Sequence, residues 1–116
     1  MTVEFRFEAA HALPYYNGIC RNLHGHGYKL SVSVCGEIDP ESGMVADFEW
    51  LKKVVQEKVL SRIDHTNLNH LLDNPTAEHL IVWIWNELKK DVSILSELRL
   101  YETDNCYVTY RGGEYV

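Results

Sequence analysis

Three histidines near the N-terminus constrain the fold of this chain more than any other feature. His24 and His26 are separated by one glycine, and His11 ends a segment in which apolar and charged residues alternate. Side chains two positions apart in a strand point to the same face of a sheet, so an extended segment would place His24 and His26 side by side. An antiparallel strand ending at His11 would add a third imidazole. Three nitrogen ligands with a fourth position open are typical of catalytic zinc.

The connection between the two predicted strands supports this interpretation. It runs from Leu13 to Leu23, contains proline, asparagine and glycine, and is longer than a tight hairpin requires. Cys20 lies within it and offers a base or a nucleophile close to the histidines. On its own, the His-Gly-His tripeptide could equally form a turn with exposed imidazoles. The presence of His11 makes a metal site the better interpretation.

The hydrophobic pattern predicts two strands, two helices and two further strands. Alternation predicts strands at residues 2–10, 26–38, 98–103 and 106–110, and helical spacing predicts helices over 47–62 and after Thr76 through Leu88. The order β-β-α-α-β-β predicts an α+β domain, a four-stranded antiparallel sheet with both helices on one face. Such a sheet has two exposed edges, which pairing with other subunits would cover.

Size, charge and cysteine count narrow the class of protein. The 116 residues are enough for a single domain, 1–116, and too few for two. The net charge of −6 argues against a nucleic-acid partner. The N-terminus resembles a strand and not a signal peptide, and we expect no membrane span. An odd number of cysteines, three, favours a reducing compartment and hence a cytoplasmic location.

Several other polar residues have two possible roles. Asp64 could orient the imidazole of His65, or His65 could simply favour the C-terminal end of a helix dipole. Glu102 could be exposed on an outer face, or its carboxylate could accept two parallel N–H donors of a ligand. Glu78 suits the first turn of a helix because of its negative charge. The sequence leaves these alternatives open.

Six short motifs follow one another along nearly the whole chain. They are Phe7–His11, Cys20–His26, Gly43–Phe48, Asp64–Asn69, Asn74–Glu78 and Glu102–Thr103. Together, and in this order, they resemble the 6-pyruvoyl-tetrahydropterin synthase / 6-carboxytetrahydropterin synthase family. Two departures are small: Ile63 stands where leucine is usual, and Tyr101 stands where lysine often precedes the glutamate.

The resemblance implies a fold and an assembly. The fold is the tunnelling fold (T-fold), whose element order agrees with the one predicted above. The assembly is a homo-oligomer, in which trimers close their sheets into a barrel and two trimers stack as a hexamer. Closure would remove the exposed sheet edges. Active sites of such proteins lie at subunit interfaces, so Glu102 could meet the zinc of a different subunit.

The resemblance also implies a substrate, 7,8-dihydroneopterin triphosphate, and roles for ten residues. His11, His24 and His26 would hold zinc, Cys20 would be the general base in a relay with Asp64 and His65, and Glu102, Thr103, Thr76 and Glu78 would bind the pterin. Zinc would acidify the hydroxyls of the substrate's side chain. The triphosphate needs a local positive charge, for which position suggests Arg21 and Lys29.

Two reactions are compatible with this resemblance. One eliminates triphosphate and gives 6-pyruvoyl-tetrahydropterin. The other also releases acetaldehyde and gives 6-carboxy-5,6,7,8-tetrahydropterin, a precursor of queuosine-type deazapurines. Three residues separate Cys20 from His24, a spacing that resembles the carboxy-forming branch. The carboxy-forming lyase is therefore the favoured hypothesis, with the pyruvoyl-forming synthase and a zinc- or pterin-binding module without turnover as alternatives.

Overall fold

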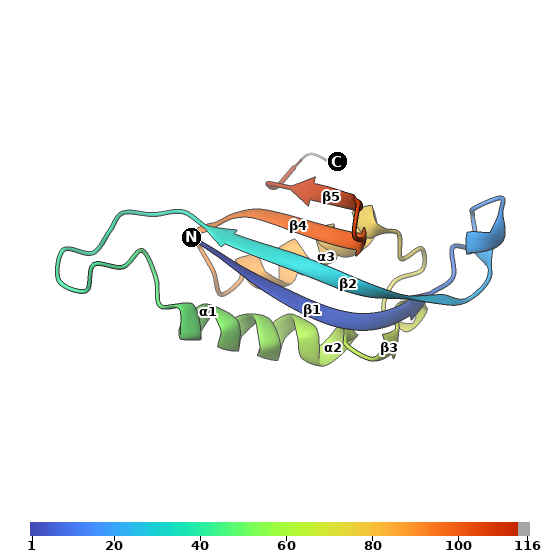
Figure 1. The fold of residues 1–116 in the computed structure, drawn as a ribbon, viewed down its shortest axis with the longest axis horizontal. Coiled ribbons are helices and arrows are strands. Elements are labelled where there is room, and N and C mark those ends of the chain that lie inside the picture. Colours follow the sequence, from blue (N-terminus) through green and yellow to red (C-terminus); the bar gives the residue numbers. More distant parts are fainter. Residues whose placement is uncertain (114–116) are drawn as a thin grey trace.

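A five-stranded sheet is the framework of the computed structural model, which describes residues 1–113 (Figure 1). The strands, in chain order, are β1 (Thr2–His11), β2 (His24–Val34), β3 (Thr66–Asn67), β4 (Leu95–Thr103) and β5 (Cys106–Tyr110). In space they lie in the order β3-β1-β2-β4-β5. The four long strands pair in antiparallel fashion, as predicted, whereas the short β3 pairs with β1 in parallel and was not predicted.

One face of the sheet carries the hydrophobic core. The register of β1 and β2 pairs Phe7 with Tyr28 and Phe5 with Leu30, so odd positions of β1 and even positions of β2 share that face. Tyr28, Leu30 and Leu100 are almost completely buried there. The alternate positions on the opposite face are mainly polar or small. This is the pattern of an antiparallel sheet that is covered on one side only.

Two helical segments cover the core face, and both begin at the predicted caps. The Asp47 carboxylate accepts a hydrogen bond from the N–H of Glu49 at 3.0 Å, and the Thr76 hydroxyl accepts one from His79 at 3.1 Å. The first segment comprises α1 (Phe48–Val55), a π-helical turn η2 (Gln56–Leu60) and α2 (Ser61–Ile63); the second is α3 (Ala77–Lys89). The wider π-turn brings both Val59 and Leu60 to the buried side.

Several predicted boundaries differ from those observed, and the larger differences have identifiable causes. β2 begins at His24 and ends at Val34, because the chain then turns into a loop that Asp39 closes with hydrogen bonds to Met44 and Gly43. β4 begins at Leu95 and not at residue 98, because pairing with β2 continues past a register shift. The predicted loop at 64–75 contains β3 and a 3₁₀ turn, η3 (Leu68–His70), whose short lengths escape periodicity analysis.

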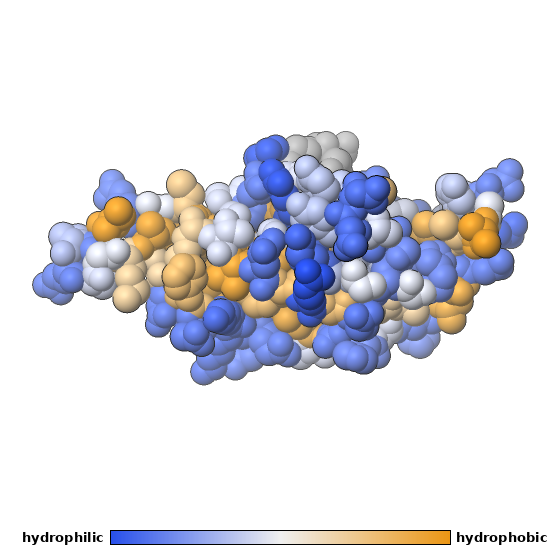
Figure 2. Space-filling model, viewed as in Figure 1, coloured by the Kyte–Doolittle hydropathy of each residue, from blue (hydrophilic) through white to orange (hydrophobic). Residues whose placement is uncertain are grey.

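Two loops extend from opposite ends of the sheet (Figure 1). The 12–23 loop follows β1 and contains the 3₁₀ turn η1 (Ile19–Arg21), and the 35–47 loop follows β2. Large hydrophobic side chains are exposed in both, and Figure 2 shows apolar groups near both ends of the long axis. Among the residues described, no helix is long and apolar enough to cross a membrane.

The contribution of the α1 cap to the stability of the fold can be tested directly. Replacing Asp47 by alanine removes the acceptor for the Glu49 N–H, so we expect the free energy of unfolding to fall by about 1 kcal/mol. Asp47→Asn keeps an oxygen acceptor and should change it little. Urea titrations of both variants measure this difference. Equal stabilities would show that the cap does not stabilise the helix.

Candidate active site

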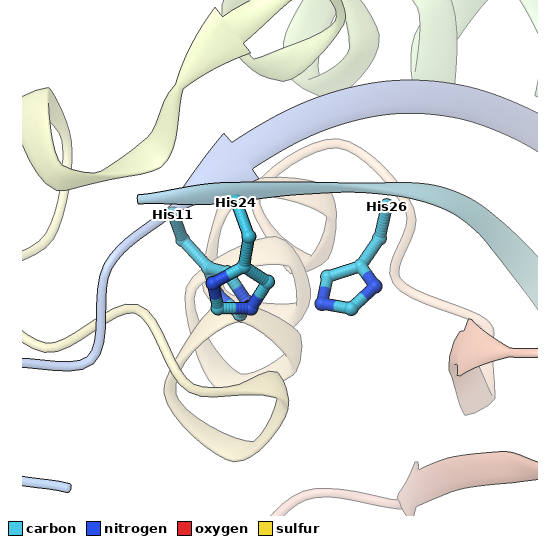
Figure 3. Close-up of side chains that lie close together, drawn as sticks. All are labelled: His11, His24 and His26. Atoms are coloured by element: carbon cyan, nitrogen blue, oxygen red, sulfur yellow. The ribbon is translucent and has the colours of Figure 1, made fainter. Parts of the chain in front are cut away.

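The β1–β2 register brings three imidazoles together on the core face. His11 lies opposite His24, and His26 lies opposite Ala9, so all three rings follow the alternation that buries Tyr28. Figure 3 shows them converging below the end of the hairpin. One potential ligand atom from each lies within 4.8 Å of the others. His11 is fully buried, and the other two are partly exposed, as a site open to a small molecule requires.

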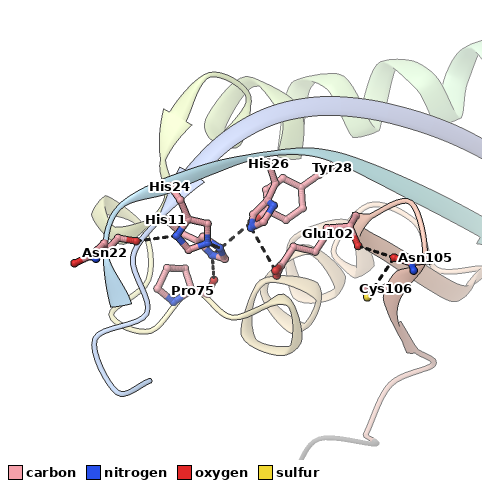
Figure 4. Close-up of polar contacts among 10 residues, drawn as sticks. His11, Asn22, His24, His26, Tyr28, Pro75, Glu102, Asn105 and Cys106 are labelled. Carbon is pink, nitrogen blue, oxygen red and sulfur yellow. Dashed lines mark hydrogen bonds and ion pairs between the residues drawn. The ribbon is translucent and has the colours of Figure 1, made fainter. Parts of the chain in front are cut away.

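Two backbone carbonyls fix which ring nitrogens face the centre of this cluster. The Nδ1 atom of His11 lies 2.7 Å from the carbonyl oxygen of Pro75, and that of His24 lies 2.7 Å from the carbonyl of Asn22 (Figure 4). A carbonyl only accepts hydrogen bonds, so both Nδ1 atoms carry the proton. The neutral rings then have a lone pair on Nε2, the usual arrangement for a metal ligand whose other nitrogen is held by the protein.

The facing nitrogens fit a cation. The Nε2 atoms of His11 and His24 lie 3.0 Å apart, and two lone pairs at that distance repel each other without a proton or a metal between them. Two nitrogen ligands of one tetrahedral zinc ion lie about 3.3 Å apart, given bonds of roughly 2.0 Å. The observed separation is close to that value. The three histidines could therefore hold a metal ion.

His26 completes the donor set. Its Nε2 atom is buried and makes no hydrogen bond within the described residues. Glu102 Oε1 lies 3.3 Å away but lacks the geometry of a hydrogen bond. Burial lowers the pKa of His26, and Glu102 only partly offsets this effect. A neutral imidazole with an unpaired buried nitrogen is the form that binds a metal.

An aromatic pair lies next to the histidines. Tyr28 is buried and stacks on Phe7 with ring centroids 4.8 Å apart and planes 4° from parallel. Its hydroxyl oxygen lies 3.4 Å from His11 Nδ1. Burial and the nearby Glu102 raise the pKa of Tyr28, so its hydroxyl stays neutral. Sequence reasoning assigned Tyr28 only to the alternating core, although its position two residues after His26 could have indicated that it adjoins the site.

Cys20 lies in the 12–23 loop, within η1, and is partly exposed. Its carbonyl oxygen accepts a hydrogen bond from the N–H of Leu13 at 3.0 Å, which closes the loop at its base. No hydrogen bond from the thiol to a described residue was found. The structure therefore places Cys20 in the loop that joins the two strands carrying the histidines, but it does not bring the thiol into contact with the other predicted relay residues, Asp64 and His65.

Asp64 and His65 do form a pair. Their Oδ1 and Nδ1 atoms lie 2.9 Å apart, and His65 has φ 59°, a left-handed conformation just beyond the end of α2. The pair is attached to β1, because Asp64 Oδ1 accepts from the N–H of Glu8 and the His65 N–H donates to the Glu8 carbonyl. A left-handed non-glycine residue costs about 1–2 kcal/mol, so the surrounding contacts hold this geometry in place.

The Asp64–His65 pair, called the dyad below, borders the face of the β1–β2 hairpin opposite to the one toward which the three imidazoles point. His65 borders a hollow of about 500 Å³ that His26 also lines and that lies over the small residues Ala10, Gly25 and Gly27, whose side-chain positions point away from the core. The histidines alternate with these residues and face the core. The single chain therefore brings Asp64 to His65, whereas the imidazoles of the three histidines point to the other face of the hairpin.

The four predicted pterin-binding residues are distributed over several places. Glu102 lies on the core face, beside His26 of its own chain, so contact with another subunit is not needed to bring it near the histidines. Thr103, the next residue, turns to the opposite face and bonds to Asn105 at 3.3 Å. Thr76 caps α3, and Glu78 borders a separate hollow of about 420 Å³ on that helix.

Comparisons with known proteins agree with this fold. The sequence profile of the family described as "6-pyruvoyl tetrahydropterin synthase" matches residues 1–113. Human 6-pyruvoyl tetrahydrobiopterin synthase is 42% identical over 106 residues, covering 82% of this chain and 72% of that protein. The 6-carboxy-5,6,7,8-tetrahydropterin synthase of Synechocystis is 41% identical over 114 residues, covering 92% and 88%.

A solved structure is also similar over nearly the whole chain. The 6-pyruvoyl tetrahydropterin synthase of Caenorhabditis elegans superimposes with a TM-score of 0.89 at 32% identity, covering 97% of this chain and 94% of that one. The fold and the family match together make this chain an enzyme domain of the T-fold type. This chain belongs to the 6-pyruvoyl tetrahydropterin synthase family, and it is a lyase of that family.

The protonation of His26 gives a prediction for the metal-free protein. Its pKa is lower in the folded chain than the usual 6.5, so the unfolded chain binds protons more readily as the pH falls below about 6.5. We expect the metal-free protein to lose stability through this range, and His26→Gln to lose less. Urea unfolding in a chelator at pH 7.5 and 5.5 measures both. An equal loss in the two proteins would contradict the assignment.

Proposed function

We propose that this chain is a zinc-dependent lyase that converts 7,8-dihydroneopterin triphosphate into 6-carboxy-5,6,7,8-tetrahydropterin, with release of acetaldehyde and triphosphate, in queuosine-type deazapurine biosynthesis. The observation that carries the proposal is the cluster of three convergent histidines, with a carboxylate beside it, in a chain of this family. The relative from Synechocystis, which is named for the carboxy product, covers most of both chains. The short spacing between Cys20 and His24 points the same way.

The donor set supports zinc as the metal. Three neutral imidazoles suit zinc, and three protein ligands leave a position open for substrate, as in catalytic zinc sites. When bound, zinc would acidify the hydroxyls of the substrate's side chain. The carbonyls of Pro75 and Asn22 would keep His11 and His24 in the ligand tautomer throughout the reaction.

Glu102 is the proposed anchor for the pterin ring. Its carboxylate lies on the metal-site face, and its side chain is 27% exposed, so a ligand can reach it. A carboxylate accepts two parallel N–H bonds from the amide and amino edge of a pterin. Phe7 and Tyr28 form a buried aromatic wall beside the site, which limits the access of water. Thr76, Thr103 and Glu78 would bind the same ring from elements that lie further from the histidines.

Cys20, Asp64 and His65 are the proposed proton-transfer residues. Cys20 as a thiolate would take a proton from the side-chain carbon of the substrate, and bound zinc nearby would favour the thiolate. Asp64 Oδ1 lies 2.9 Å from Nδ1 of His65, so the carboxylate would orient the ring and Nε2 would take up and release the proton. This pairing supports the dyad as the proposed partner of Cys20 in a relay.

The proposed assembly follows from where these groups lie. Because the dyad and the histidines occupy opposite faces of one hairpin, we propose that the dyad of one chain serves the histidines of a neighbour in a trimer or hexamer. The edges are available: β3 covers only Ala9 and Ala10 of β1, and β5 is the last strand in the sheet order. Pairing β1 with β5 of the next chain would close a barrel.

The pyruvoyl-forming synthase is the second candidate. The human relative named for this activity is as similar as the carboxy-type relative, and both reactions use the same substrate. The two candidates differ in whether carbon is lost from the side chain. For location, the three cysteines are free in the structure, which supports a reducing compartment such as the cytoplasm. Neither candidate involves a nucleic-acid or membrane partner.

Product analysis tests the reaction. We expect the zinc-loaded protein to convert 7,8-dihydroneopterin triphosphate into 6-carboxytetrahydropterin with one equivalent of acetaldehyde, measured by mass spectrometry and an aldehyde assay. His24→Ala, which removes one proposed ligand, should lose both zinc and activity. Pyruvoyl-tetrahydropterin without acetaldehyde would favour the second candidate. Zinc binding without any turnover would indicate a binding module.

Mixed oligomers test the shared active site. His24→Ala lacks a metal ligand, and His65→Gly lacks the dyad imidazole while tolerating the left-handed backbone at that position. Each variant alone should be nearly inactive. Random co-assembly at equal amounts should restore about a quarter of the wild-type activity if the two groups come from different chains. No recovery in verified mixed oligomers would show that each chain uses its own dyad.

A further inference from the structure

The segment 64–75, which connects α2 to α3, lies alongside the end of β1 and the beginning of the 12–23 loop. Two contacts of this segment are described above: Asp64 binds the Glu8 backbone, and the Pro75 carbonyl binds His11. A third contact, made by Asn69, has no part in the proposed chemistry. The side chain of Asn69 makes two hydrogen bonds with the backbone of Ala12, which together are called the Asn69 clamp. Its Oδ1 accepts from the Ala12 N–H at 2.7 Å, and its Nδ2 donates to the Ala12 carbonyl at 2.9 Å. Ala12 directly follows the metal-ligand candidate His11.

Asn69 is itself well oriented for this contact. Its backbone N–H donates to Asn67 Oδ1 at 3.0 Å, and Asn67 pairs with Ala10 in the short strand β3. The side-chain amide of Asn69 therefore extends the pairing between β3 and β1 by one more step, with a side chain in place of a strand backbone. Because the backbone of Asn69 is held at this point, less conformational entropy is lost when its side chain binds Ala12.

The clamp at Ala12 extends to Cys20. Leu13, the next residue, donates its N–H to the carbonyl oxygen of Cys20 at 3.0 Å. The backbone of Cys20 is thus bonded directly to Leu13, and Leu13 follows Ala12, which the side chain of Asn69 holds. A second tether, from the Tyr15 hydroxyl to Asp73 at 3.1 Å, joins the same loop to the same connection but lies exposed to solvent.

Packing does little to hold the loop in place. Tyr15 is 74% exposed and Ile19 is 84% exposed, so large apolar side chains of the loop find few partners within the chain. A segment with few buried contacts depends on its hydrogen bonds for its position. Of the two tethers to the 64–75 connection, the Asn69 clamp is the partly buried and bidentate one.

We propose that Asn69 is a positioning residue, which sets the location of Cys20 relative to His11 through the backbones of Ala12 and Leu13. The proposal rests on the proposed role of Cys20 as the general base. Asn69 does not reach the reacting atoms itself. A misplacement of a reacting group by about 1 Å can reduce the rate by roughly a hundredfold, so a backbone clamp near the base has a large effect on turnover.

Two substitutions of similar size separate the parts of the clamp. Asn69→Leu removes both hydrogen bonds, whereas Asn69→Asp keeps the acceptor for the Ala12 N–H and places an oxygen against the Ala12 carbonyl. Ser96→Ala is the matched control, since it removes one side-chain bond to a distant backbone carbonyl, that of Ser33, on the β2–β4 pair. Amide hydrogen exchange over residues 12–22, zinc content, kcat and KM are measured for each zinc-loaded protein.

For Asn69→Leu we expect exchange in residues 12–22 to accelerate about tenfold, which corresponds to the loss of roughly 1.4 kcal/mol of local protection. We expect kcat to fall by about 10- to 100-fold, KM to change by less than about threefold, and zinc content to stay unchanged. Asn69→Asp should give smaller changes of the same kind. Ser96→Ala should leave exchange in the loop and kcat as they are.

Three results would overturn the proposal: unchanged exchange in the loop of Asn69→Leu, accelerated exchange with a full kcat, or loss of zinc from that variant. Loss of zinc would show that the clamp supports His11 rather than Cys20. Cys20→Ala, measured in parallel, tests the proposed function separately. If Cys20→Ala retains turnover, the base role itself fails, whatever the Asn69 variants do.

Discussion

The register of the β1–β2 hairpin is the constraint on which the rest of the structure depends. The pairing that stacks Phe7 on Tyr28 and buries Leu30 also places His11 opposite His24 and leaves His26 next to Tyr28 on the same face. A slip by one residue would turn the whole set to the other face, exposing the core and dispersing the imidazoles together. Hydrophobic packing along the hairpin therefore specifies the geometry of the histidine cluster, and the cluster needs no separate framework.

The same arrangement concentrates unfavourable electrostatics where the histidines meet. Backbone carbonyls orient the Nε2 lone pairs of His11 and His24 toward each other at 3.0 Å, and His26 contributes a buried nitrogen that has no hydrogen-bond partner among residues 1–113. Such groups cost stability in the absence of a cation. The buried side chains along the remainder of the sheet offset this cost, as is common where a protein keeps a binding site ready for its ligand.

Much of the fold and part of the site were predictable from local sequence. Alternation located β1 and β2, side-chain caps located both helices, and strand spacing placed His24 and His26 on one face. The rest depended on contacts between distant residues. The carbonyls of Pro75 and Asn22 are backbone groups with no signature in the sequence, and Asn69 binds Ala12 across 57 positions. Asp64 and His65 are held in place by hydrogen bonds to Glu8, which lies 56 positions before Asp64 and has no local sequence signature for this contact.

The glycines between the histidines give the outer face of the same hairpin its shape. Side chains at 25 and 27 would point to the face opposite the imidazoles, and a Cβ at Gly27 would lie 3.3 Å from a carboxylate oxygen of Glu8. Their absence leaves the hollow of about 500 Å³ that His65 borders. One short segment thus forms a face that carries the imidazoles and, behind it, a bare face beside an acid–imidazole dyad. Under the proposed relay, the dyad of one chain would serve the imidazoles of another, so the proposed assembly would serve the chemistry as well as cover the sheet edges.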